Sequence, residues 1–168
     1  GIFGVLASEP VIKPIIDGLS KLEYRGYDSS GISILDTNKS ITTVRAKGKL
    51  TNLKKKLKGN RLKGKIGIGH TRWATHGIPS TDNAHPHSSD NVSIVHNGII
   101  ENYSSLKKDL LKKGYKFHSQ TDSEVIAHLL DFELKNNQPD VALKSTLSKL
   151  EGAFAIAIIF KNFDLLAG

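Results

Sequence analysis

The residues best suited to chemistry lie close together between positions 65 and 102. This segment holds five of the seven histidines, the only tryptophan and Arg72, within a background rich in Gly, Thr, Asn and Pro. Such a background buries little apolar surface, so its polar groups indicate a binding or catalytic site rather than a core. The polar runs are His70–Gly77, Asn83–His87 and His96–Asn102.

Three positions could act on a charged substrate, and each also has an ordinary structural explanation. Arg72 could bind a carboxylate through two parallel hydrogen bonds or form a surface ion pair, and the polar residues crowded around it favour the first. Asn97 and Gly98 could form a simple turn, or they could offer an amide and a backbone N–H to an oxyanion. Asp122 could stabilise the first turn of a helix or bind an ammonium group.

The histidines raise the question of a metal ion. In the run His85-Pro86-His87 two imidazoles lie close together, as zinc ligands often do. No cluster of acidic residues lies near them in the sequence, and the chain has no cysteine. We therefore expect no metal site and no other cofactor.

Composition limits the classes of protein to which the chain can belong. Its 168 residues, 38% hydrophobic and 24% charged, suit one globular domain or part of a larger one. No apolar run approaches the roughly 18 residues of a membrane span, and no leader precedes Gly1, so we expect a cytoplasmic protein without membrane contact. The net charge of +8 comes mostly from lysine. Because Leu50, Leu53 and Leu57 recur at helical spacing among these lysines, we expect a solvated helix face rather than a nucleic-acid site.

The elements that must position the polar runs can be read from hydrophobic spacing. Strands are expected near residues 2–7, 31–35, 41–44, 65–69, 92–96, 153–160 and 165–167. Helices are expected near residues 11–22, 50–57, 106–111, 125–134 and 141–150. Gly114 suits the end of one helix, and the run Thr121–Glu124 predicts a capping box before another. Strands in adjacent pairs and helices in groups favour an α+β fold.

Four separated motifs, in order along the whole chain, resemble those of the class II glutamine amidotransferases, in the branch that makes glucosamine 6-phosphate. They are residues 23–31, 70–77, 83–87 and 95–102. The resemblance implies an Ntn-hydrolase fold, which is a four-layer αββα sandwich. In this family the glutaminase domain continues beyond the point that corresponds to residue 168. The resemblance further implies that residues 1–168 are an incomplete glutaminase domain and that the sugar isomerase domain is absent.

The resemblance also assigns roles to individual residues. Arg72 would bind the α-carboxylate of glutamine and Asp122 its α-ammonium group, while Asn97 and Gly98 would form the oxyanion hole. The family's loop that closes over glutamine would run from Trp73 through Thr75 to His76. Arg25 and Gly26 would lie beside the amino terminus of the nucleophile.

One departure from the family affects the expected activity. The family's nucleophile is an N-terminal Cys, which would stand immediately before Gly1, and it is absent from this sequence. The chain as written should bind glutamine without hydrolysing it, whereas an enzyme with that Cys would release ammonia for transfer to fructose 6-phosphate. The alternative is a glutamine-binding module without catalysis. At full length we expect a homo-oligomer, with the isomerase domain as partner.

Overall fold

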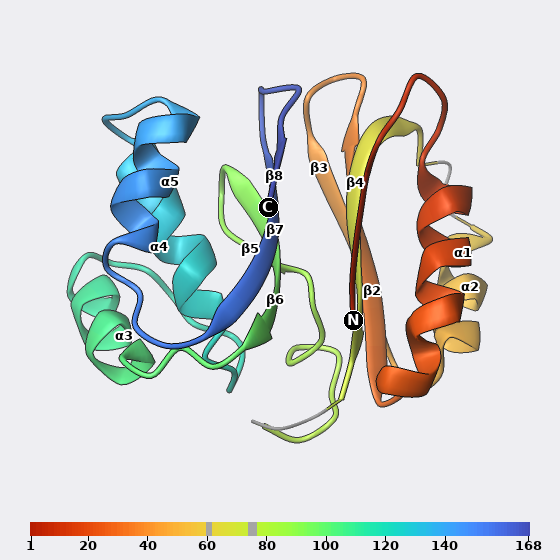
Figure 1. The fold of residues 1–168 in the computed structure, drawn as a ribbon, viewed down its shortest axis with the longest axis horizontal. Coiled ribbons are helices and arrows are strands. Elements are labelled where there is room, and N and C mark those ends of the chain that lie inside the picture. The colour runs from red at the N-terminus through yellow and green to blue at the C-terminus, as the bar shows by residue number, and fades with distance from the viewer. Residues whose placement is uncertain (60–61, 74–76) are drawn as a thin grey trace.

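The fold consists of four stacked layers, in the order helices, sheet, sheet and helices (Figure 1). The computed structural model describes residues 1–59, 62–73 and 77–168. The strands are β1 (Ile2–Leu6), β2 (Ser29–Asp36), β3 (Ile41–Lys47), β4 (Gly64–Arg72), β5 (His87–Ser88), β6 (Val92–Gly98), β7 (Phe154–Phe160) and β8 (Leu166–Ala167). The helices are α1 (Ile12–Leu22), the 3₁₀ helix η1 (Glu23–Arg25), α2 (Leu50–Leu57), α3 (Tyr103–Lys112), α4 (Glu124–Leu134) and α5 (Pro139–Leu147).

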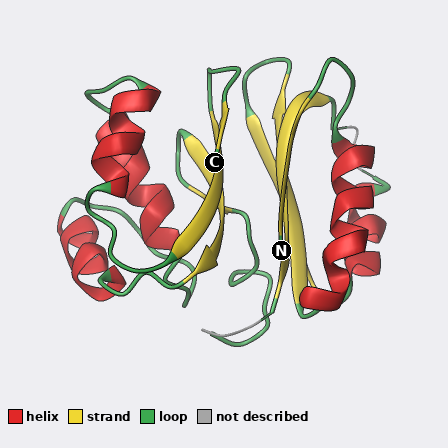
Figure 2. Ribbon diagram, viewed as in Figure 1, coloured by secondary structure: helices red, strands yellow, loops and turns green. Residues whose placement is uncertain are grey.

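Both sheets are antiparallel and lie face to face in the middle of the molecule (Figure 2). The first sheet has the order β1-β4-β2-β3 and is covered by α1 and α2 on its outer face. The second has the order β5-β6-β7-β8 and is covered by α3, α4 and α5. The predicted α+β class and the αββα sandwich are confirmed.

Alternation along the strands of the first sheet separates two apolar layers. Ile32 and Ile34 of β2 pack into the cluster beneath α1 and α2. Leu35, together with Ile66 and Ile68 of β4, faces the second sheet. Ser33 also points between the sheets, where its hydroxyl lies 2.7 Å from that of Ser93 on β6. Each central strand therefore has one face on the helices and the other on the opposite sheet.

Two glycines of β4 bring α1 close to the first sheet. A Cβ atom added at Gly67 or Gly69 would lie 2.7 or 2.6 Å from a methyl carbon of Ile15 on α1. Side chains at these positions would push the helix away from the strand. The apolar cluster beneath the second sheet is built mainly from α4, β6 and β7. The two sheets are thus held firmly, and the strand ends that reach the polar segment are fixed in position.

The expected elements are present, with boundaries shifted by up to a few residues. Gly114 follows the end of α3 in a left-handed conformation, as predicted, with a φ of +89°. The capping box is wrong: Ser123 is the N-cap of α4 and makes no capping hydrogen bond with its side chain. The Glu124 carboxylate instead accepts hydrogen bonds from the backbone N–H groups of His118 and Ser119.

Among the described residues, no helix is long and apolar enough to cross a membrane. Continuation of the sandwich beyond residue 168 stays a prediction.

Candidate active site

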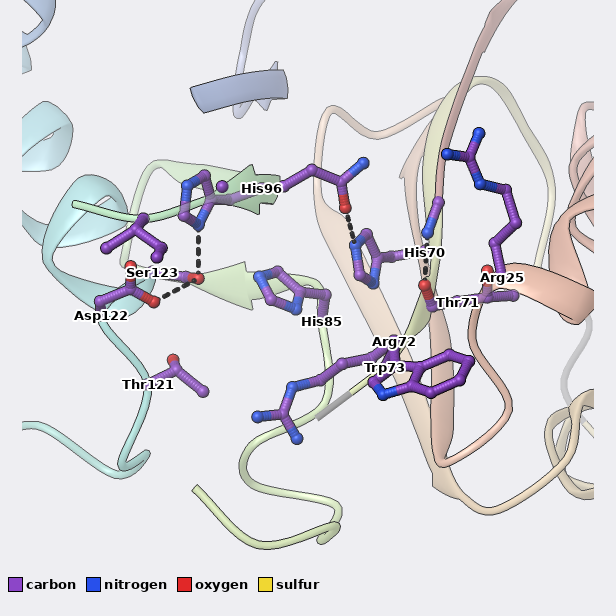
Figure 3. A pocket seen from close by; sticks show the side chains of 14 residues that line it. Arg25, His70, Thr71, Arg72, Trp73, His85, His96, Thr121, Asp122 and Ser123 are labelled. Carbon is purple, nitrogen blue, oxygen red and sulfur yellow. Dashed lines mark hydrogen bonds between the residues drawn. The ribbon is translucent and has the colours of Figure 1, made fainter. Parts of the chain in front are cut away.

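A cavity of about 310 Å³ lies where β4 of one sheet and β6 of the other end side by side. Figure 3 shows the polar side chains that surround it. Its walls come from the N-terminus, the end of β4, the loop before β5, the end of β6 and the segment before α4. The lining residues are Gly1, Arg25, His70, Thr71, Arg72, Trp73, His85, His96, Asn97, Gly98, Ile99, Thr121, Asp122 and Ser123.

Arg72 and Asp122 bring opposite charges into this cavity. Arg72 is the last residue of β4, and its side chain extends toward the segment that carries Thr121 and Asp122 (Figure 3). It is 5% exposed, and Asp28 lies 3.9 Å from its guanidinium group. Burial lowers the pKa of Arg72, while the charges of Asp28 and Asp122 act in the opposite direction. Two buried opposite charges separated by a cavity suit a zwitterionic ligand.

Asp122 is held in place by hydrogen bonds at both carboxylate oxygens. Oδ2 accepts a hydrogen bond of 2.8 Å from the backbone N–H of Ile100, and Oδ1 accepts one of 3.4 Å from the Ser123 hydroxyl. Ser123 is in turn 2.7 Å from Nδ1 of His96. Asp122 is therefore anchored before any ligand binds, so its position is fixed by the protein.

Asn97 and Gly98 occupy the end of β6 at the opposite wall. The side-chain oxygen of Asn97 lies 2.8 Å from Nε2 of His70. Gly98 has φ +122°, and a Cβ atom there would lie 2.2 Å from the carbonyl oxygen of Ala153. Only glycine fits this position without strain. Asn97 and Gly98, two successive residues, thus lie together in the wall of the cavity.

The amino terminus reaches the cavity through the pairing of β1 with β4. The Gly1 amino group donates a hydrogen bond of 2.5 Å to the carbonyl oxygen of Thr71, and Gly1 accepts one of 3.0 Å from the Thr71 N–H. Burial, and then the charge of Arg25, lower the pKa of this amino group from 8.0 to about 6. Gly26 packs on the same strand end, since a Cβ there would lie 2.8 Å from the Thr71 carbonyl oxygen.

Trp73 lies at the edge of the cavity and is 59% exposed. Its ring meets that of Tyr27 edge to face, with 5.5 Å between centroids. Thr75 and His76, predicted to belong to the closing loop, lie outside the described residues. The structure therefore brings together Arg25, Arg72, Trp73, Asn97, Gly98 and Asp122, with Gly26 directly behind them.

Three buried histidines, His70, His85 and His96, line the cavity, and a fourth, His87, packs against His85. The residue patterns assigned them no role. The rings of His70 and His85 lie 4.3 Å apart, those of His85 and His87 4.6 Å apart, and His85 sits between His70 and His96 (Figure 3). Burial is the main cause that lowers all four pKa values, to about 3 for His70 and His87. They are neutral near pH 7. His70, His87 and His96 make hydrogen bonds to other side chains, whereas neither ring nitrogen of His85 has a partner among the described residues. The signal in the sequence that could have revealed these histidines is their crowding within a polar segment.

Comparison with known proteins decides the family. Residues 70–167 match a family model described as a glutamine amidotransferase domain. The chain belongs to the glutamine amidotransferase family. Two solved structures support the assignment at the level of fold: glutamine phosphoribosylpyrophosphate amidotransferase from B. subtilis (30% identity, TM-score 0.79, 95% of this chain and 35% of that chain), and a class-II glutamine aminotransferase domain protein from Silicibacter pomeroyi (15% identity, TM-score 0.63, 94% and 71%).

Within the glutamine amidotransferase family, curated relatives share about half of their residues with this chain. The glutamine--fructose-6-phosphate aminotransferase [isomerizing] of Mesorhizobium japonicum is 53% identical over 170 residues, which cover 100% of this chain and 28% of the relative. The protein of the same name from Clostridium acetobutylicum is 52% identical over 161 residues, covering 95% and 26%. The chain thus spans little more than a quarter of these relatives.

Proposed function

We propose that this domain binds glutamine and, with a Cys immediately before Gly1, hydrolyses its side-chain amide. The observation that carries the proposal is the placement of Arg72, Asp122 and the Asn97–Gly98 pair around one cavity. Arg72 would bind the α-carboxylate and Asp122 the α-ammonium group. With the two ends of the amino acid held in this way, its side chain is directed toward Asn97 and Gly98.

The register of β1 on β4 supports the position of the nucleophile. Ile2 pairs with His70 and Gly1 with Thr71, so a preceding residue would fall opposite Arg72 at the cavity. A Cys there would carry the free α-amino group, which could accept the thiol proton. Burial and then the charge of Arg25 lower the pKa of the Gly1 amine, and both would act on the amine of the Cys too. A base with a pKa near neutral suits this task.

The reaction then follows acyl-transfer chemistry. The thiolate attacks the amide carbon of glutamine, and the carbonyl oxygen becomes an oxyanion that the Asn97 amide and the Gly98 N–H stabilise. The amine returns its proton to the leaving nitrogen, the C–N bond breaks, and ammonia departs. Water attacks the resulting thioester, breaks its C–S bond and releases glutamate with the free thiol.

The names of the relatives support a sugar phosphate as the acceptor of this ammonia. We propose that residues 1–168 are the glutaminase part of a longer polypeptide whose isomerase domain transfers the ammonia to fructose 6-phosphate. A cytoplasmic homo-oligomer is the expected form of that protein.

Glutamate release by the full-length protein with its N-terminal Cys tests the proposal. In that protein Asn97→Ala should lower kcat by roughly 10²–10³ with little change in KM, because an oxyanion donor acts mainly in the transition state. Replacing the Cys by Ala should abolish turnover and leave glutamine binding measurable by calorimetry. Binding without turnover in the Cys-containing protein would establish the alternative, a binding module. A normal kcat with a raised KM in Asn97→Ala would place Asn97 in ground-state binding instead.

A further inference from the structure

We propose that His70 is a positioning residue that turns the amide of Asn97 so that its NH₂ group, rather than its oxygen, faces the cavity. This inference rests on the proposed function, because it assigns a cause to the orientation of one oxyanion donor. The two residues belong to different sheets, with His70 on β4 and Asn97 on β6. A dashed line from His70 in Figure 3 marks the hydrogen bond that joins them.

The orientation follows from the atoms that this hydrogen bond uses. An Asn amide has an oxygen that only accepts and an NH₂ group that only donates. The atom 2.8 Å from Nε2 of His70 is the oxygen of Asn97, so Nε2 must be the donor. Once the oxygen is engaged, the NH₂ group remains for a ligand. A flipped amide would present its oxygen to the developing oxyanion and repel it.

The imidazole of His70 is itself held firmly. It is 3% exposed, and its backbone lies between β1 and β2 in the first sheet, opposite Ile2 on one side and Gly31 on the other. The ring of His85 lies against it at 4.3 Å, with 36° between the two planes. A fixed ring with its Nε2 proton aimed at one atom therefore favours one of the two amide orientations.

The buried surroundings keep this donor neutral. Burial, followed by the positive charge of the amino terminus, lowers the pKa of His70 to about 3. A neutral imidazole carries a single ring proton, which the hydrogen bond to Asn97 assigns to Nε2. Placing the proton on Nδ1 would leave two acceptors, Nε2 and the amide oxygen, facing each other.

A pair of substitutions in the full-length protein with its N-terminal Cys separates positioning from packing. The amide nitrogen of Gln reaches about as far as Nε2 of His, whereas that of Asn reaches only as far as Nδ1. We expect His70→Asn to lower the kcat for glutamine hydrolysis by about 10- to 100-fold, with KM little changed. This loss is smaller than that expected for Asn97→Ala, which deletes the oxyanion donor itself. His70→Gln should restore most of kcat. In the Asn97→Ala background, His70→Asn should lower kcat by less than about 2-fold, because its effect acts through Asn97.

A normal kcat in His70→Asn, or an equal further loss in the Asn97→Ala background, would overturn the proposal. Absence of glutamine hydrolysis in the unmodified full-length protein would refute the proposed function instead. In that event the ¹⁵N spectrum of residues 1–168 decides the orientation of the Asn97 amide. A proton on Nε2 of His70, coupled by a nuclear Overhauser effect to the Asn97 side chain, supports the inference; a proton on Nδ1 contradicts it.

Discussion

Acidification from pH 7 to pH 5 should destabilise this domain steeply, because four histidines are folded into its interior as neutral side chains. His70, His85, His87 and His96 are each between 2% and 4% exposed. Burial lowers the pKa of each, to about 3 for His70 and His87 and well below the usual value for His85. The charge of Glu124 on His87, the charge of Asp122 on His96 and the hydrogen bond of Asn97 to His70 oppose this effect in part.

The sign and size follow from proton linkage. Below pH 6.5 the unfolded chain binds a proton at each histidine, whereas the folded chain does not until the pH approaches the lowered value. The full stability is therefore present above pH 6.5 and is lost as the pH falls. Each such histidine removes about 1.4 kcal/mol per pH unit, so three or four together remove about 4–6 kcal/mol per unit. A domain with an unfolding free energy of about 5–15 kcal/mol would unfold about one to three units below pH 6.5.

Urea unfolding followed by circular dichroism at several pH values between 7.5 and 5 measures this slope. His85→Gln should reduce the slope by about 1.4 kcal/mol per pH unit, because the chain then takes up one proton fewer when it unfolds. His118→Gln provides the matched control, since His118 lies exposed on the surface, and it should change the slope less than His85→Gln does. An unfolding free energy that stays constant from pH 7 to pH 5, or an equal effect of both variants, would refute the assignment of neutral buried histidines.

Two further predictions concern the walls of the cavity. Arg72→Lys and Asp122→Asn should each weaken glutamine binding at least about 10-fold in calorimetric titrations, since an ammonium cannot make the two-pronged contact and an unpaired buried charge is costly; unchanged affinity in both would remove these residues from substrate binding. Gly98→Ala should lower the unfolding free energy by about 2–4 kcal/mol, because its Cβ would meet the Ala153 carbonyl and its φ of +122° strains any side chain. An unchanged urea midpoint would contradict this.

The helices, the strands and the charged residues of the site could be predicted from the sequence, because these features depend on local signals. Hydrophobic spacing located α1 and β4 directly, and motif resemblance singled out Arg72, Asn97 and Asp122. The boundaries were less accurate where tertiary contacts extend a strand. Arg72, for example, belongs to β4 although the apolar run ends near Gly69.

The remaining features depend on contacts between distant segments. The hydrogen bond from His70 to Asn97 crosses from one sheet to the other over 27 positions of sequence, which no local pattern encodes. The capping box failed for a similar reason. Glu124 was expected to reach back to Thr121, but its carboxylate instead accepts hydrogen bonds from the backbone N–H groups of His118 and of the buried Ser119. The hydroxyl oxygen of Thr121 instead lies 3.0 Å from Nε2 of His87.

A crystal structure of this domain with glutamate, the product of the proposed reaction, would test the central claim most directly. We expect the α-carboxylate on the Arg72 guanidinium, the α-ammonium group on Asp122, and the side-chain carboxylate beside the Asn97 amide and the Gly98 N–H. Glutamate bound in the reverse orientation, with its α-carboxylate at Asn97, or bound away from this cavity, would contradict the account.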